Sequence, residues 1–166
     1  MRSTVLLLLV SLPAFAQSQP NAITAACGPS HVTFTAHEAD SPLVPPSIEA
    51  GKALVFFIQD EGQLSEARHY TLKIGLDGAW VGAYRDNAVF AISVDPGEHH
   101  ICTNVQSKFE VGQNLSFAHF TAEPGKVYYF RTHLSEYGGH MEIDQPDSDQ
   151  AKYLISIYPA SVSKKK

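Results

Sequence analysis

Two segments of this chain share one pattern, in which an acidic residue and Pro-Gly precede a run of β-forming residues. The first segment is DPGEHHIC (95–102) and the second is EPGKVYYF (123–130). Proline presets φ at about −65° and glycine tolerates positive φ, so Pro-Gly favours a tight turn that leads into a strand. These turns frame a run of antiparallel strands and constrain the chain to an all-β architecture.

Alternating and continuous apolar runs predict the individual strands. Residues 31–37 (HVTFTAH) alternate between apolar and polar side chains, as a half-buried strand does. Residues 52–59 (KALVFFIQ) are almost continuously apolar, which predicts a central strand buried on both faces. Residues 70–84 predict a hairpin around Asp77-Gly78, a dipeptide that favours type I′ turns. Further strands are predicted at 88–94, 98–105, 115–122 and 126–134.

The rest of the chain predicts loops, one helix and the limits of the domain. Residues 38–51 are rich in proline and residues 135–146 contain Gly-Gly, so both predict loops. Asp147 is a candidate N-cap for a short helix over 147–157. We therefore predict one antiparallel β-sandwich of about 7–8 strands with a short C-terminal helix, in the manner of small sandwich domains. This domain would span 31–158 and precede a solvated basic tail at 159–166.

The N-terminus has the features of a secretory signal peptide over residues 1–16. Arg2 precedes an apolar run, and Ala14-Phe15-Ala16 offers a small-x-small cleavage site. A polar leader at 17–30 follows. No other segment has about 18 consecutive apolar residues, so no transmembrane span is expected. The chain is predicted to be exported by a bacterium to the periplasm or the exterior, with outer-membrane association as an alternative.

The two cysteines, Cys27 and Cys102, predict a disulfide, because an even pair in an exported protein usually forms one. One alternative is a lipid anchor at Cys27, since the small residues Thr24-Ala25-Ala26 precede it. Another alternative is a metal ligand at Cys102.

The order of these segments resembles a known family. The strand KALVFFI, the hairpin LKIGLDGAWVGAY, and the segments FAISVDPGEHHI and FTAEPGKVYYFRTHL carry the resemblance. Together they resemble the bacterial secreted and lipoprotein domain-of-unknown-function family 2846, over residues 52–157. Similar motifs recur in carboxypeptidase-regulatory-like and transthyretin-like sandwiches. The resemblance implies an envelope-associated or exported β-domain, and it brings no catalytic residues with it.

Net charge and sequence motifs limit the classes of function that the sequence supports. The formal net charge is −5, and no basic stripe for nucleic acid is present. There is no G-x-S-x-G nucleophile motif, so we do not predict an enzyme. No cofactor is predicted. The leading interpretation is a non-catalytic exported module that binds a protein or glycan partner in the cell envelope.

The alternative function is metal binding, since the chain has eight histidines. Strand alternation could bring His119, His133 and one of His99 or His100 onto one sheet face. Such a cluster could hold Zn²⁺ or Cu²⁺, with Glu142 or Asp144 as a carboxylate ligand. The competing interpretation is that these are solvated or hydrogen-bonded strand histidines.

Aromatic residues suggest a binding face for the leading function. Trp80, at the end of the predicted hairpin, together with Tyr84 and Tyr137, could stack on a sugar or grip a partner protein. The competing interpretation places these rings in or beside the core, where small sandwiches commonly hold a large aromatic.

Overall fold

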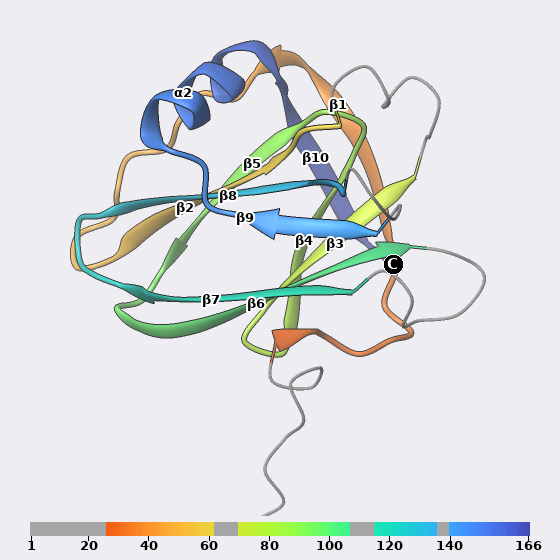
Figure 1. The fold of residues 1–166 in the computed structure, drawn as a ribbon, viewed down its shortest axis with the longest axis horizontal. Coiled ribbons are helices and arrows are strands. Elements are labelled where there is room, and N and C mark those ends of the chain that lie inside the picture. The colour runs from red at the N-terminus through yellow and green to blue at the C-terminus, as the bar shows by residue number, and fades with distance from the viewer. Residues whose placement is uncertain (1–25, 62–69, 107–114, 136–139) are drawn as a thin grey trace, which may run out of the picture.

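The computed structural model describes residues 26–61, 70–106, 115–135 and 140–166. Two β-sheets pack face to face, and one short helix lies across the outer face of the larger sheet (Figure 1). The predicted all-β sandwich with a short C-terminal helix is therefore confirmed. The predicted signal peptide and Tyr137 lie outside the described residues.

The two sheets contain six and four strands. The larger sheet has the order β1 (Phe34–Pro42), β10 (Pro159–Lys165), β5 (Val89–Val94), β2 (Ala53–Gln59), β8 (Val127–Leu134) and β9 (Met141–Asp144). The smaller sheet has the order β4 (Ala79–Arg85), β3 (Thr71–Leu76), β6 (Gly97–Gln106) and β7 (Ser116–Ala122). Among the described strands, the pairs β2–β8 and β10–β5 are parallel and the others are antiparallel. The sandwich is thus not purely antiparallel.

Each Pro-Gly turn carries the chain from one sheet to the other. Pro96-Gly97 leads from β5 of the larger sheet into β6 of the smaller one, which begins at Gly97, and Pro124-Gly125 lies between β7 and β8. Gly97 has φ 134° and Gly125 has φ 74°, a backbone region that favours glycine. The strands before and after each turn therefore do not pair with each other. As a result, β8 lies beside β2 and runs parallel to it.

The hairpin of β3 and β4 has the predicted turn. Asp77 and Gly78 both have positive φ, at 50° and 80°, as a type I′ turn requires. The two strands then pair from Leu76↔Ala79 to Thr71↔Arg85.

Strand β2 is buried along its whole length, as its apolar run predicts. Val55 and Phe57 point between the sheets, while Leu54, Phe56 and Ile58 point to the opposite face. The inner side chains join residues of both sheets in the main core, which includes Leu72, Ile74, Tyr84, Ile101, Phe120 and Phe130.

The helix α2 (Ser148–Ile157) covers part of the outer face of β2. It begins where predicted, since the Asp147 side chain accepts hydrogen bonds from the backbone N–H of Asp149 and Gln150, each at 2.9 Å. Its buried residues Ala151, Leu154 and Ile155 pack on the outward side chains of β2. The described residues contain no helix with the length and hydropathy needed to cross a bilayer.

The predicted basic tail at 159–166 is wrong, because most of it forms strand β10. This strand pairs with β1 from Phe34↔Lys165 to Pro42↔Pro159. It also holds the smaller sheet, since Ser161 Oγ donates to the Ala83 carbonyl (2.8 Å) and the Ala83 N–H donates to Ser163 Oγ (3.2 Å). The predicted loop at 135–146 likewise contains strand β9.

The disulfide between Cys27 and Cys102 is present, with 5.2 Å between the two Cα atoms. Both cysteines are buried on the outer face of the smaller sheet, where they pack with Phe34 and Trp80. A cysteine in this bond has no free thiol for a lipid or a metal. In this structure Cys27 is therefore not a lipid anchor and Cys102 is not a metal ligand.

Candidate functional site

The outer face of the larger sheet carries an open apolar groove of about 610 Å³ beside α2. Leu54 and Phe56 of β2 and Val127 and Tyr129 of β8 line it from the sheet, and Ile155 lines it from the helix. The rings of Phe56 and Tyr129 stack at a centroid distance of 5.6 Å. Because α2 has only ten residues, its buried side covers only part of this sheet face. Leu54 and Phe56 are buried at 2% and 4% exposure, while Val127 and Tyr129 of β8 stay partly exposed at the groove.

The segment between β1 and β2 forms the second wall. Pro42, Pro45 and Pro46 line the groove together with Leu43 and Ile48. Proline fixes φ and loses little conformational entropy on ordering, so this wall is largely preformed. Small-molecule sites are typically concave, mostly apolar and about 300–1,000 Å³ in volume, and this groove has those features.

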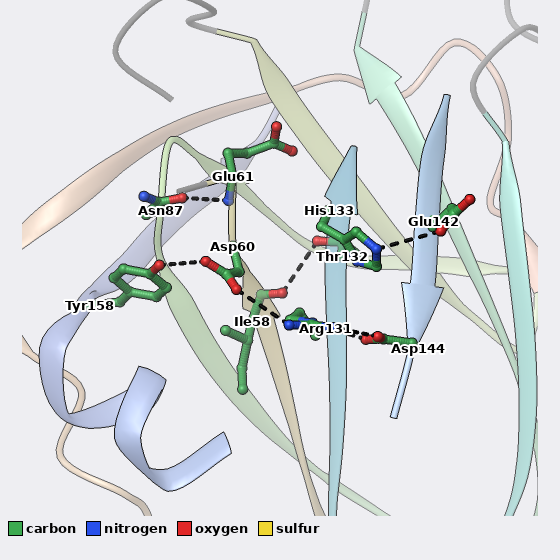
Figure 2. A network of polar contacts seen from close by, with 10 residues as sticks. All are labelled: Ile58, Asp60, Glu61, Asn87, Arg131, Thr132, His133, Glu142, Asp144 and Tyr158. Atoms are coloured by element: carbon green, nitrogen blue, oxygen red, sulfur yellow. Dashed lines mark hydrogen bonds and ion pairs between the residues drawn. The ribbon is translucent and has the colours of Figure 1, made fainter. Parts of the chain in front are cut away.

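A polar network holds α2 in place at the end of the helix (Figure 2). Tyr158, the C-cap residue, donates its hydroxyl proton to Asp60 Oδ1 at 2.5 Å. Arg131 Nη1 lies 3.5 Å from Asp60 Oδ2. On its other side Arg131 makes two hydrogen bonds to Asp144, at 3.1 and 2.6 Å. The network thus links the helix to β2, β8 and β9.

Ionisation equilibria favour the intact network. The hydrogen bond to Asp144 is the largest influence on the pKa of Arg131 and raises it, outweighing partial burial. Burial and the hydrogen bond to Asp60 raise the pKa of Tyr158. Arg131 therefore stays charged and Tyr158 keeps its proton at neutral pH. The geometry of this network positions the helix against the sheet.

A second polar cluster lies between the sheets at the end of β2. Tyr84 Oη lies 3.1 Å from Thr132 Oγ1, and Thr132 donates to the Ile58 carbonyl at 3.3 Å. Burial raises the pKa of Tyr84, so its hydroxyl stays protonated in the core. The Glu61 carboxylate accepts a hydrogen bond from the Tyr70 hydroxyl, and the Glu61 backbone N–H donates to Asn87 Oδ1 at 2.7 Å. These contacts close one end of the core.

The β8–β9 hairpin carries a chain of polar contacts on its surface. Ser135 Oγ lies 3.2 Å from His140 Nδ1, and His140 Nε2 lies 3.3 Å from Glu142 Oε1. His133 Nε2 lies 3.5 Å from the other oxygen of Glu142. The order Ser–His–Glu matches a catalytic triad, but His140 is 58% exposed and lies at the end of β8 opposite to the groove. A surface hairpin of this kind lacks the water-excluded cleft that triad chemistry uses.

The candidate metal-binding histidines do not meet at one point. His119 lies on β7 of the smaller sheet and His133 on β8 of the larger one. The expectation that these two residues share one sheet face is therefore wrong. His100 and His119 are directly opposed across β6 and β7, with ring centroids 6.4 Å apart. His99 instead lies against Phe120 and Asp77. Among the described residues, no three His, Cys, Asp or Glu side chains are placed to hold a metal ion together.

Two of the three candidate aromatic residues are inaccessible. Trp80 is 5% exposed, its indole N–H donates to the Pro29 carbonyl at 2.8 Å, and Lys73 Nζ lies 4.2 Å from its ring centroid. Tyr84 is 0% exposed in the main core. The expectation that these two rings form a binding face is therefore wrong. The disulfide-bonded segment covers Trp80, and Tyr84 packs in the main core between the two sheets.

The groove residues were missed in the sequence because four segments contribute to it: the β1–β2 segment, β2, β8 and α2. Phe56 was predicted to be core, and residues 38–51 were predicted to be only a loop. The available signal was the apolar content of that loop, where Leu43, Val44 and Ile48 stand among prolines. Val44 is 84% exposed and Ile48 is 39% exposed, so these residues are not there to fill a core.

Together these features define a disulfide-linked β-sandwich with an apolar groove on its helix-covered face. No family model and no curated protein matches the chain. Among solved structures, the chain is similar to the "NMR structure of the protein from Eubacterium rectale", with a TM-score of 0.42 and 15% identity. That match covers 60% of this chain and 92% of the other. The resemblance to family 2846 stays a prediction.

Proposed function

We propose that this chain is an exported, non-catalytic binding module that holds an apolar ligand, or an apolar group of a partner protein, in the groove beside α2. The groove carries the proposal, since a concave, mostly apolar groove with a proline-rich wall has the features of a binding site. Because the sheet floor and the proline-rich wall are already ordered, binding costs less conformational entropy.

The disulfide supports the exported location. Disulfides persist in oxidising compartments such as the bacterial periplasm and the exterior, and are rare in the cytosol. The sequence adds a signal-peptide pattern at residues 1–16. Glycan binding is the weaker form of the proposal, because Trp80 and Tyr84 are buried.

The test uses a neutral, environment-sensitive dye such as Nile red, with the disulfide-intact protein. We expect saturable binding to the wild type and its loss in Ser47→Trp, because Ser47 lines the groove and a ring there fills it. Ser41→Trp is the matched control, since Ser41 is exposed on β1 and does not line the groove. Equal dye binding by all three proteins, or none by the wild type, would exclude the groove as the binding site.

A further inference from the structure

The formal charge on the groove lining is of one sign, positive. Of the described residues that line it, Lys152 is the only one with a formal charge, and no carboxylate lines it. The next carboxylate along the β1–β2 segment, Glu49, forms an ion pair with Lys52 at 3.2 Å. A single cation therefore stands at the edge of an apolar surface, in a chain whose formal net charge is −5.

Lys152 is available to a ligand. Its Nζ lies 3.7 Å from Asp149 Oδ1, and the two side chains are 64% and 94% exposed. Ion pairs this exposed contribute little to stability, so the ammonium can exchange Asp149 for another anion at small cost. The long lysine stem can also lie along the groove while its charge stays in water.

Hydroxyl groups add hydrogen-bonding capacity to the groove lining. Tyr129 and Ser47 both line the groove, and each hydroxyl can donate a hydrogen bond. The ligand that complements this surface has an apolar body for the sheet floor and an anionic head for Lys152. A cationic head would face Lys152 with like charge, and an uncharged one would leave the ammonium without a new partner.

We infer that the groove binds a free, single-chain amphiphile with one carboxylate head group, such as a fatty-acid-like molecule, with its chain along Val127 and Tyr129 and its head at Lys152. This inference rests on the proposed function and names its ligand class. A single lysine on an acidic domain is not the polybasic surface that docks on anionic membranes, so the ligand is a free molecule and not a bilayer.

The experiment compares three amphiphiles of equal chain length, used below their critical micelle concentrations. A carboxylate, an alcohol and an amine are each titrated against Nile red bound to the wild-type protein. We expect the carboxylate to bind at least about fivefold more tightly than the alcohol, which is about 1 kcal/mol because tenfold is about 1.4 kcal/mol. The amine should bind most weakly.

Substitutions at and near Lys152 test whether its charge causes the preference for the carboxylate. Lys152→Ala should bring the carboxylate to the affinity of the alcohol without changing the alcohol, and Lys152→Glu should make the amine the best ligand. Asp149→Asn should tighten carboxylate binding, because it removes the competing anion. Lys165→Ala, at an exposed residue near the end of β10, is the control and should change nothing.

The outcomes separate this inference from the proposed function. Equal binding of all three amphiphiles, with loss of binding in Ser47→Trp, would keep the groove and overturn the carboxylate preference. No displacement of bound dye by any amphiphile would likewise overturn the inference. Binding to anionic phospholipid vesicles without binding to the free carboxylate would replace it by membrane docking. Failure of the dye itself to bind would end both proposals.

Discussion

His99 Nδ1 lies 2.6 Å from Asp77 Oδ2, and the other ring nitrogen, Nε2, lies 2.7 Å from the Asp95 carbonyl oxygen. Both partners are acceptors only, so the ring satisfies both contacts when each nitrogen carries a proton. The remaining oxygen of Asp77 accepts from the His100 N–H at 2.8 Å. The imidazolium of His99 thus joins the β3–β4 turn to the Pro-Gly turn that precedes β6.

The first prediction concerns the pKa of His99. Burial is its largest single influence and lowers the pKa, but the contacts with Asp77 and Asp95 together outweigh it, so the pKa is raised. A raised native pKa contributes stability below the unfolded-state pKa of about 6.5, and this contribution is lost as the pH rises through the native value. The stability difference between wild type and His99→Gln should therefore be larger at pH 5 than at pH 8.

Denaturant unfolding at the two pH values measures this difference, and an NMR titration gives the pKa directly. His119→Gln is the control, because His119 is exposed on the same sheet and makes no such pair of contacts. A native His99 pKa below that of the unfolded chain would contradict the assigned contacts.

The second prediction concerns the disulfide, which joins cysteines 75 residues apart. Closing a loop of that length restricts the unfolded chain and stabilises the fold by about 4 kcal/mol in the chain-entropy model. The double variant Cys27→Ala/Cys102→Ala should lose most of that free energy of unfolding in urea. Reductant should destabilise the wild type and leave the double variant unchanged. A loss below about 1 kcal/mol would show that the disulfide contributes little beyond the packing of segment 26–34.

The sequence predicted the elements that local chemistry specifies. Strand β2, the Asp77-Gly78 turn and the helix after Asp147 follow from an apolar run, a turn dipeptide and an N-cap, each readable within a few residues. The disulfide followed from cysteine number. His133 does lie beside Glu142, one of the two carboxylates that the sequence placed near it.

The sequence could not predict what depends on long-range pairing. Alternation tells which side chains share a strand face, but not to which sheet the strand belongs, so His119 and His133 were wrongly brought together. Strand β10 has little apolar pattern, and its structure comes from pairing with β1 and from the Ala83 contacts. The groove has the same origin, since its walls meet only in the folded chain.

The third prediction concerns the junction of α2 with the sheet. Tyr158→Phe removes the hydroxyl that donates to Asp60 and leaves the ring in place. Hydrogen bonds to charged groups contribute about 1.5–3 kcal/mol when intact, and this partly buried one should cost about 1–2 kcal/mol when lost. Because the bond holds the helix that lines the groove, dye affinity should fall as well.

Tyr153→Phe is the matched control on the same helix, since Tyr153 is 63% exposed. Thermal unfolding and Nile red titration of both variants test the prediction. If Tyr158→Phe and Tyr153→Phe behave alike, the hydroxyl of Tyr158 does not anchor the helix.

The last prediction concerns strand β10, which stands between β1 and β5 and links the two sheets through Ser161 and Ser163. Removal of residues 159–166 would expose the edges of β1 and β5 and take both partners from the Ala83 backbone. Unpartnered backbone groups cost about 1–3 kcal/mol each, so we expect a loss of at least about 3 kcal/mol and association through the exposed edges.

Lys164→Gln/Lys165→Gln keeps the strand but removes its charge, and it should stay monodisperse and nearly as stable as wild type. Size-exclusion chromatography and thermal unfolding of the truncated and charge-neutralised proteins distinguish strand pairing from charge. A truncated chain that elutes and unfolds like the full chain would mean that β10 is dispensable to the sandwich.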